Sequence, residues 1–144
     1  MSETDNTSIE AQIIINRENV SSLLTQGKFD EIGALPGFKI IENADLDPDN
    51  NPDCYKWSLK QEGGSVYTRL KRFSTEHHTV EDPIKGDFVI YFSKGKMTHM
   101  GKFSEEGKVI SKFGKAHVYE HPIGVVPVSY LDKDNDIRFY RKNI

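Results

Sequence analysis

Residues 86–113 constrain the fold of this chain most strongly, because they predict three consecutive antiparallel strands. Residues 88–92 form a continuous apolar run, which is typical of a strand buried on both faces. Two polar turns divide the rest of the stretch into two further strands. The strands predicted over the whole second half of the chain are residues 88–92, 97–103, 108–113, 117–119 and 136–141.

The first half of the chain predicts helices. After Asn16, apolar residues recur at helical spacing as far as Gly27, and residues 9–15 are either a strand or the approach to this helix. Residues 38–41 predict one short strand. Helices followed by antiparallel strands indicate an α+β architecture, with N-terminal helices packed on a small antiparallel sheet.

The composition limits the class of protein. Residues 1–8 are expected to be a flexible tail, and residues 9–144 are long enough to form a single domain. A net charge of −3 (19 basic and 22 acidic residues) gives no sign of a nucleic-acid partner or an anionic membrane. The chain lacks a signal-peptide pattern and an apolar run that could cross a bilayer. We expect a cytoplasmic location, although export without a signal peptide stays open.

The only cysteine, Cys54, lies where a helix is predicted to begin. Asn51 is a good N-cap, Pro52 suits the first helical position, and Gly63-Gly64 supplies a stop. The helix dipole would favour a thiolate at Cys54, whereas the neighbouring Asp53 opposes a second negative charge. The competing interpretation of Cys54 is a small buried side chain.

His99 stands in the middle of a predicted strand. Strict alternation would place Met97, Gly101 and Phe103 on its face, so the imidazole is expected to be partly or wholly covered. A core histidine satisfied by one hydrogen bond is one interpretation. A catalytic base is the other, and it requires the thiol of Cys54 to lie nearby.

The length of the turn after this strand decides which side chain of the next strand joins His99. A loop of two or four residues puts Lys112 on the His99 face, and a loop of three residues puts Ser111 there. The sequence leaves both registers open. His121 could also reach this region from the following segment.

The order of these parts resembles the NlpC-type branch of the papain-like cysteine peptidases. The matching stretches are Asp53-Cys54, the Gly86-Asp87 pair with its apolar run, His99-Met-Gly-Lys-Phe103, and the hairpin at residues 106–110. The resemblance spans about residues 51–113. It implies a papain-like fold in which a helix carries the nucleophile and a sheet carries the base.

The chain departs from that family at two places. Tyr55-Lys56-Trp57 replaces the small residues that follow the cysteine, and Ser111 stands where a third polar group, often histidine, is usual. Ser111-Lys112-Phe-Gly, His121 and Trp57 also resemble a bacterial family of unknown function. The resemblance therefore implies that Ser111 acts with Cys54 and His99. The candidates for an alternative third group or for substrate contacts are Lys112, His121, Asp53 and Trp57.

The resemblance implies a cysteine-dependent amide hydrolase, which is a peptidase, amidase or deamidase, or an acyl transferase. His99 would deprotonate Cys54, the thiolate would attack an amide carbonyl, and the backbone N–H of Cys54 would stabilise the oxyanion. The partner is a peptide or protein amide, and no cofactor is expected. The alternative is a papain-like fold without catalysis that acts as a protein-binding module. Nothing in the sequence fixes the oligomeric state.

Three other patterns predict little chemistry. The acidic residues 43–53 lack the glycine and final glutamate of a calcium loop. His77-His78, in the predicted loop 75–85, should point apart and therefore make a poor metal site. Arg69, Lys71 and Arg72 form the polar face of a predicted helix at residues 66–73, which is typical of a solvated face rather than a nucleic-acid site.

Overall fold

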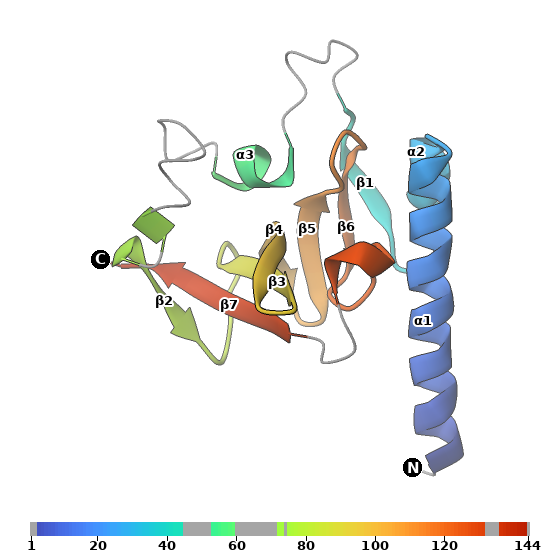
Figure 1. The fold of residues 1–144 in the computed structure, drawn as a ribbon, viewed down its shortest axis with the longest axis horizontal. Helices are drawn as coiled ribbons and strands as arrows, with labels where there is room; N and C mark the ends of the chain where they lie inside the picture. The colour runs from blue at the N-terminus through green and yellow to red at the C-terminus, as the bar shows by residue number, and fades with distance from the viewer. Residues whose placement is uncertain (1–2, 45–52, 60–71, 74, 132–135, 144) are drawn as a thin grey trace.

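The computed structural model describes residues 3–44, 53–59, 72–73, 75–131 and 136–143, and it has a mixed α+β fold around one antiparallel sheet (Figure 1). The helical elements in these ranges are α1 (Glu3–Thr25), α2 (Phe29–Ile32), α3 (Cys54–Leu59) and the 3₁₀ helix η3 (Val128–Tyr130). The strands are β1 (Lys39–Glu42), β2 (His77–Val80), β3 (Phe88–Ser93), β4 (Lys96–Glu105), β5 (Lys108–Lys112), β6 (Val118–Pro122) and β7 (Asp136–Lys142). The α+β class predicted from the sequence is confirmed.

The seven strands lie in the order β1-β6-β5-β4-β3-β7-β2, and every neighbouring pair is antiparallel. The two hairpins predicted from residues 86–113 are present as β3-β4 and β4-β5. β7 was expected to close the sheet, but it is inserted between β3 and β2, so that β2 forms the edge. Strands from both halves of the chain therefore build one sheet.

Both faces of the sheet are covered, because successive side chains of a strand point to opposite sides. We call the side covered by α1, α2 and η3 the α1 face, and the side covered by α3 the α3 face. The buried apolar cluster of the α1 face contains Val20, Ile32, Val89, Tyr91, Val109, Phe113, Ala116, Tyr119, Val125, Val126 and Leu131. The buried cluster of the α3 face contains Leu59, Phe73, Phe88, Ile90 and Met100.

A β-bulge at Thr98 separates two residues that strict alternation placed together. Tyr91 pairs with His99, but the next residue of β3, Phe92, pairs with Met97, so that β4 has one extra residue. Met97 consequently packs on the α3 face, whereas His99 points to the α1 face. The prediction that Met97 shares a face with His99 is wrong for this reason.

A second bulge, at Ser104, sets the register of β5. The two-residue turn alone would put Lys112 on the His99 face, but the extra residue in β4 brings Ser111 opposite Gly101. Ser111 therefore shares a face with His99, which is the outcome predicted for a three-residue loop. Lys112 points to the other side of the sheet.

The first helix begins earlier than the sequence pattern suggested. Residues 3–8, expected to be a flexible tail, are the first part of α1, and residues 9–15 are helical as well. No glycine or proline interrupts residues 3–26, so nothing in the local chemistry stops a helix from forming there. None of the described helices, α1 included, is both long and apolar enough to cross a membrane.

Strand β2 replaces part of the predicted loop at residues 75–85. It forms because β7 pairs with it over its whole length, from His77 opposite Lys142 to Val80 opposite Phe139. A pairing partner about sixty residues further along the chain gives no local signal in this segment. The helix predicted at residues 66–73 and the acidic loop at residues 43–53 lie largely outside the described residues.

Candidate functional site

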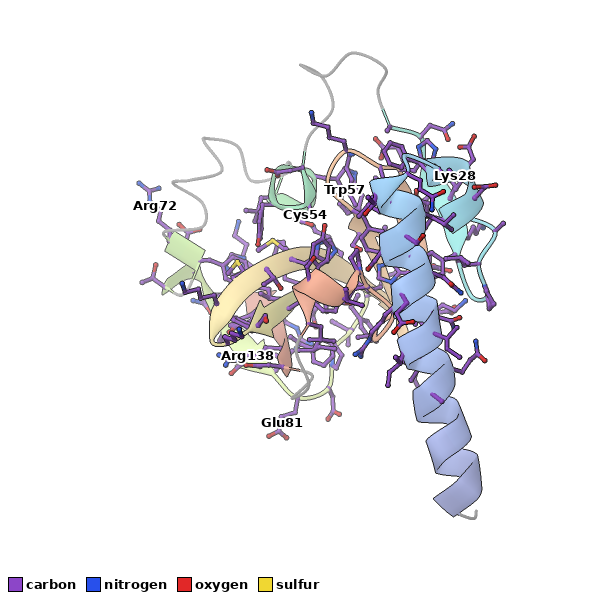
Figure 2. All side chains as sticks on the ribbon, turned by 45° about the vertical axis from the view of Figure 1, so that its right-hand side comes forward. Lys28, Cys54, Trp57, Arg72, Glu81 and Arg138 are labelled. Atoms are coloured by element: carbon purple, nitrogen blue, oxygen red, sulfur yellow. The ribbon has the colours of Figure 1, made fainter. Side chains whose placement is uncertain are left out.

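Cys54 is the first residue of α3 and is nearly closed off from solvent, with 6% of its surface exposed. Figure 2 shows it on the side of α3 that faces the sheet. Leu59 packs α3 against the sheet, and the Ser58 hydroxyl donates a hydrogen bond to the Met100 carbonyl at 3.3 Å. These contacts fix the position of α3 against the sheet. The predicted N-cap at Asn51 and Pro52 and the predicted stop at Gly63-Gly64 lie outside the described residues.

Burial decides the protonation state of Cys54. Loss of solvent raises the pKa of the thiol to about 11, a backbone hydrogen bond with Met100 acts against this, and the charge of Asp53 adds to it. The sequence left open whether the helix dipole or Asp53 would prevail, and neither is the largest cause. Cys54 is therefore a neutral thiol at physiological pH.

His99 is completely buried among aromatic rings on the α1 face. Its ring centroid lies 5.3 Å from that of Tyr91, 5.5 Å from that of Phe113, and 4.6 Å from that of Tyr130, on which it stacks at 19°. Among the residues that the structure describes, neither imidazole nitrogen has a hydrogen-bond partner. Burial holds the pKa of His99 well below its ordinary value, with a smaller contribution in the same direction from His121.

The structure does not join Cys54 and His99 by a hydrogen bond. Both nitrogens of His99 are without a partner, and α3 packs against the face of the sheet opposite to the His99 side chain. Met100, the residue after His99, is the one that contacts the α3 side. The nucleophile and base expected from the sequence, on α3 and β4, therefore lie on opposite faces of the sheet and are not engaged with each other.

Tyr130 stacks on His99, a contact that the sequence pattern did not single out. Burial, followed by the charge of Cys54, raises the pKa of Tyr130 to about 12. The available signal was a tyrosine in the segment after Pro127, which alone does not indicate a role.

Ser111 and His121 form a complete buried pair. The Ser111 Oγ lies 2.6 Å from His121 Nε2, and His121 Nδ1 lies 2.8 Å from the Pro122 carbonyl oxygen. A carbonyl only accepts, so Nδ1 carries the proton and Nε2 accepts the hydrogen bond that Ser111 donates. The His121 ring also stacks on Phe38. Ser111, proposed as the third group for His99, is instead bonded to His121.

Lys112 has a structural task on the α3 side. Its Nζ donates hydrogen bonds to the carbonyls of Gly114 at 2.9 Å and Ala116 at 2.6 Å, which fixes the turn after β5. Burial lowers the pKa of Lys112, while the charges of Asp53 and Cys54 act in the opposite direction. Lys112 is therefore a buried, hydrogen-bonded side chain, not a solvated strand residue.

Asp53 and Trp57 flank Cys54 at the start of α3. The Asp53 carbonyl accepts a hydrogen bond from the Trp57 backbone N–H at 2.9 Å, and the Trp57 indole donates one to Glu42 Oε2 at 3.2 Å. Trp57 therefore ties α3 to β1. The side chain of Lys56 lies outside the described residues.

The remaining sequence patterns do not form a second site. His77 and His78 point apart as predicted: Nδ1 of His77 lies 3.1 Å from the Phe73 carbonyl, and Nδ1 of His78 lies 2.8 Å from Asn143 Oδ1. Among the described residues, no three His, Cys, Asp or Glu side chains are grouped to hold a metal ion. Two residues of the basic run, Arg69 and Lys71, lie outside the described ranges.

A shallow hollow of about 420 Å³ lies at the end of α1 and is lined by Gly27, Lys28, Phe29, Asp30, Glu31 and His117. His117 Nε2 donates to Asp30 at 2.6 Å, and its Nδ1 accepts from the Ala44 N–H at 2.8 Å. Both nitrogens are committed to the protein. The hollow therefore offers no free base.

Comparison of the chain with models of protein families, with curated proteins and with solved structures found no match.

Proposed function

We propose that this chain is a cysteine-dependent amide hydrolase of the papain-like type, in which Cys54 is the nucleophile and His99 is the base. The observation that carries the proposal is the pair of unpartnered nitrogens on the wholly buried imidazole of His99. An unsatisfied buried polar group costs about 1–3 kcal/mol, so it calls for an explanation. A base whose nitrogens the fold leaves uncommitted provides one.

In the proposed reaction, His99 carries protons between the Cys54 thiol, the leaving amine and water. Because Cys54 and His99 lie on opposite faces of the sheet, the reaction requires a rearrangement that turns His99 toward α3. His99 then takes the proton of the Cys54 thiol, and the sulfur adds to the carbonyl carbon of an amide. As the C–N bond breaks, His99 returns the proton to the leaving amine, and a thioester remains on Cys54. His99 then takes a proton from water, whose oxygen displaces the sulfur, so that an acid leaves and the thiol is restored.

Both groups are neutral at rest, because burial raises the pKa of the thiol to about 11 and lowers the pKa of the imidazole. Proton transfer from the thiol to the imidazole is therefore unfavourable in the resting fold, and catalysis requires that substrate binding change the surroundings of both groups. The substrate class is a peptide or protein amide. An amine in place of water would turn the same intermediate toward acyl transfer.

A second function is favoured by a specific observation. Cys54 is almost closed off from solvent and makes no hydrogen bond with His99, as expected for a papain-like fold that binds a protein without catalysis. In that case Cys54 is a small core residue, and the Ser111–His121 pair is purely structural. The two functions differ in whether His99 controls the reactivity of Cys54.

Alkylation of Cys54 by iodoacetamide separates them. We expect His99→Gln to slow alkylation at pH 7–8 at least tenfold, because general-base help is typically worth about 10²–10⁴-fold. His77→Gln, which removes another buried histidine, is the matched control and should react like the wild type. Release of amine or ammonia from a panel of peptide and side-chain amides is measured in parallel. Equal alkylation in all three proteins, without turnover of any amide, would favour the binding module.

A further inference from the structure

His117, in the segment before β6, joins two segments from the first half of the chain through its two ring nitrogens. Its Nδ1 accepts a hydrogen bond from the Ala44 N–H, two residues after the end of β1, at 2.8 Å. Its Nε2 lies 2.6 Å from Asp30 Oδ1 in α2. An ionised carboxylate only accepts, so the proton of the neutral ring is on Nε2 and the lone pair is on Nδ1.

The two bonds respond in opposite ways when the ring takes up a second proton. An imidazolium carries a proton on both nitrogens. The bond from Nε2 to Asp30 then becomes a charge-assisted ion pair, which is stronger than the neutral bond. At Nδ1 the acceptor is lost, and two N–H groups would face each other across 2.8 Å. Protonated His117 can therefore hold Asp30 but not the Ala44 N–H.

The position of His117 allows it to titrate. Its side chain is 13% exposed and lines the hollow at the end of α1, so protons reach the ring. Histidine is the side chain that ordinarily changes charge between pH 5 and pH 8. The titratable and charged side chains on the elements around the ring are Asp30, Glu31 and Lys28 at α2, Glu42 at β1, Tyr119 at β6 and Lys115 in the preceding turn.

The end of β1 is also attached to α3. Glu42, the last residue of β1, accepts a hydrogen bond from the Trp57 indole of α3 at 3.2 Å. Ala44 follows two residues later, so release of its N–H loosens the end of β1 and with it this attachment of α3. The hydrogen bond between α3 and β4 does not pass through His117.

We propose that His117 is a pH-sensitive latch on the end of β1. The neutral ring holds both α2 and the Ala44 N–H, whereas the protonated ring keeps α2, releases Ala44 and loosens the attachment of α3 to β1. The change takes place between pH 8 and pH 5. This inference does not depend on the proposed function, because it needs only the two bonds of His117 and the bond between Glu42 and Trp57.

Amide hydrogen exchange of the full chain, followed by NMR, tests the latch directly. The protection factor of the Ala44 N–H compares its exchange rate with that of an unfolded peptide at the same pH. It should fall about three- to tenfold between pH 8 and pH 5, the change expected for the loss of one hydrogen bond. His117→Gln removes the titrating ring, so its Ala44 protection factor should be equal at both pH values. An unchanged protection factor in the wild type would overturn the latch.

Two further variants assign the response to the imidazole. Asp30→Asn keeps an oxygen acceptor for Nε2 but has no carboxyl group, so the Ala44 protection factor should still fall on acidification. Loss of the response in this variant would assign it to the carboxyl group and overturn the role of His117. His78→Gln removes a histidine bonded to Asn143 on another strand, and as the matched control it should respond like the wild type.

The fluorescence of Trp57, the only tryptophan of the chain, tests whether the latch reaches α3. Its emission should change between pH 8 and pH 5 in the wild type and stay constant in His117→Gln, because the indole is bonded to the end of β1. An equal change in both proteins would overturn the coupling to α3.

Discussion

His99 and His121 are two wholly buried histidines that both lie against Phe113, and their hydrogen bonding is opposite. Both nitrogens of His121 are committed, one to Ser111 and one to the Pro122 carbonyl. Neither nitrogen of His99 is. His121 thus has a structural role, whereas the core does not require the imidazole of His99, although both histidines lie in nearly the same surroundings. An imidazole that the fold leaves unsatisfied is the better candidate for chemistry.

Acidification should change the free energy of unfolding more than any single substitution, because both histidines are neutral in the folded protein. Burial lowers the pKa of His121 to about 4, whereas the unfolded chain titrates near 6.5. Below pH 6.5 the unfolded state binds a proton that the folded state does not, so stability falls as the pH drops from 6.5 toward 4. His121 alone should contribute a loss of about 3 kcal/mol.

Urea unfolding across pH 4–8 measures this loss. His121→Leu should flatten the dependence, whereas an unchanged slope in this variant would show that other groups cause it. The ion pair between Asp87 and Arg141 adds a loss of stability only at the acid end of this range. The pKa of Asp87 lies below its ordinary value in the folded protein, and the carboxyl of the unfolded chain takes up a proton at about pH 4.

Loss of the partner of His121 should give an intermediate effect. Ser111→Ala leaves His121 Nε2 buried without a donor, which should cost about 1–3 kcal/mol of unfolding free energy at pH 7. Ser104→Ala, which removes a serine hydroxyl bonded to Glu120 in a more accessible place, is the control and should cost less. Chemical denaturation of both variants measures the two losses of unfolding free energy. A loss under about 0.5 kcal/mol for Ser111→Ala would mean that the pair is not a structural unit.

Removal of the His99 imidazole should have the smallest effect on stability. His99→Leu replaces an unsatisfied polar ring by an apolar side chain, so the unfolding free energy should change by less than about 1 kcal/mol or increase. Thermal and urea unfolding at pH 7 measure it. A loss of more than about 3 kcal/mol, the size expected for a satisfied core residue, would remove the contrast between the two histidines.

Much of the sheet followed from local pattern. The apolar run of β3 and the turns on both sides of β4 lie close together in the sequence, so the two hairpins were predictable. β2 was not, because it depends on pairing with β7 at the far end of the chain. The early start of α1 was missed because a polar, acidic start suggested a tail, although no residue there breaks a helix.

The sequence predicts which residues belong to the candidate site, but not how these residues are arranged. Cys54 at the head of a helix follows from its neighbours, and His99 on a strand follows from the apolar pattern. The bond between Ser111 and His121 could not be predicted, since it depends on a bulge at Ser104 that sets which face each residue takes. Tyr130 carries no local signal for its position on His99.

The sequence by itself determined that this chain has a strand-rich second half, that Cys54 lies at the start of a helix and that His99 lies inside a strand, because spacing, turn residues and caps act over a few positions. Only the tertiary structure decided on which side of the sheet each group lies, which histidine has partners and how deeply Cys54 is buried. These properties depend on bulges and on contacts between segments distant in the chain, so no local pattern encodes them.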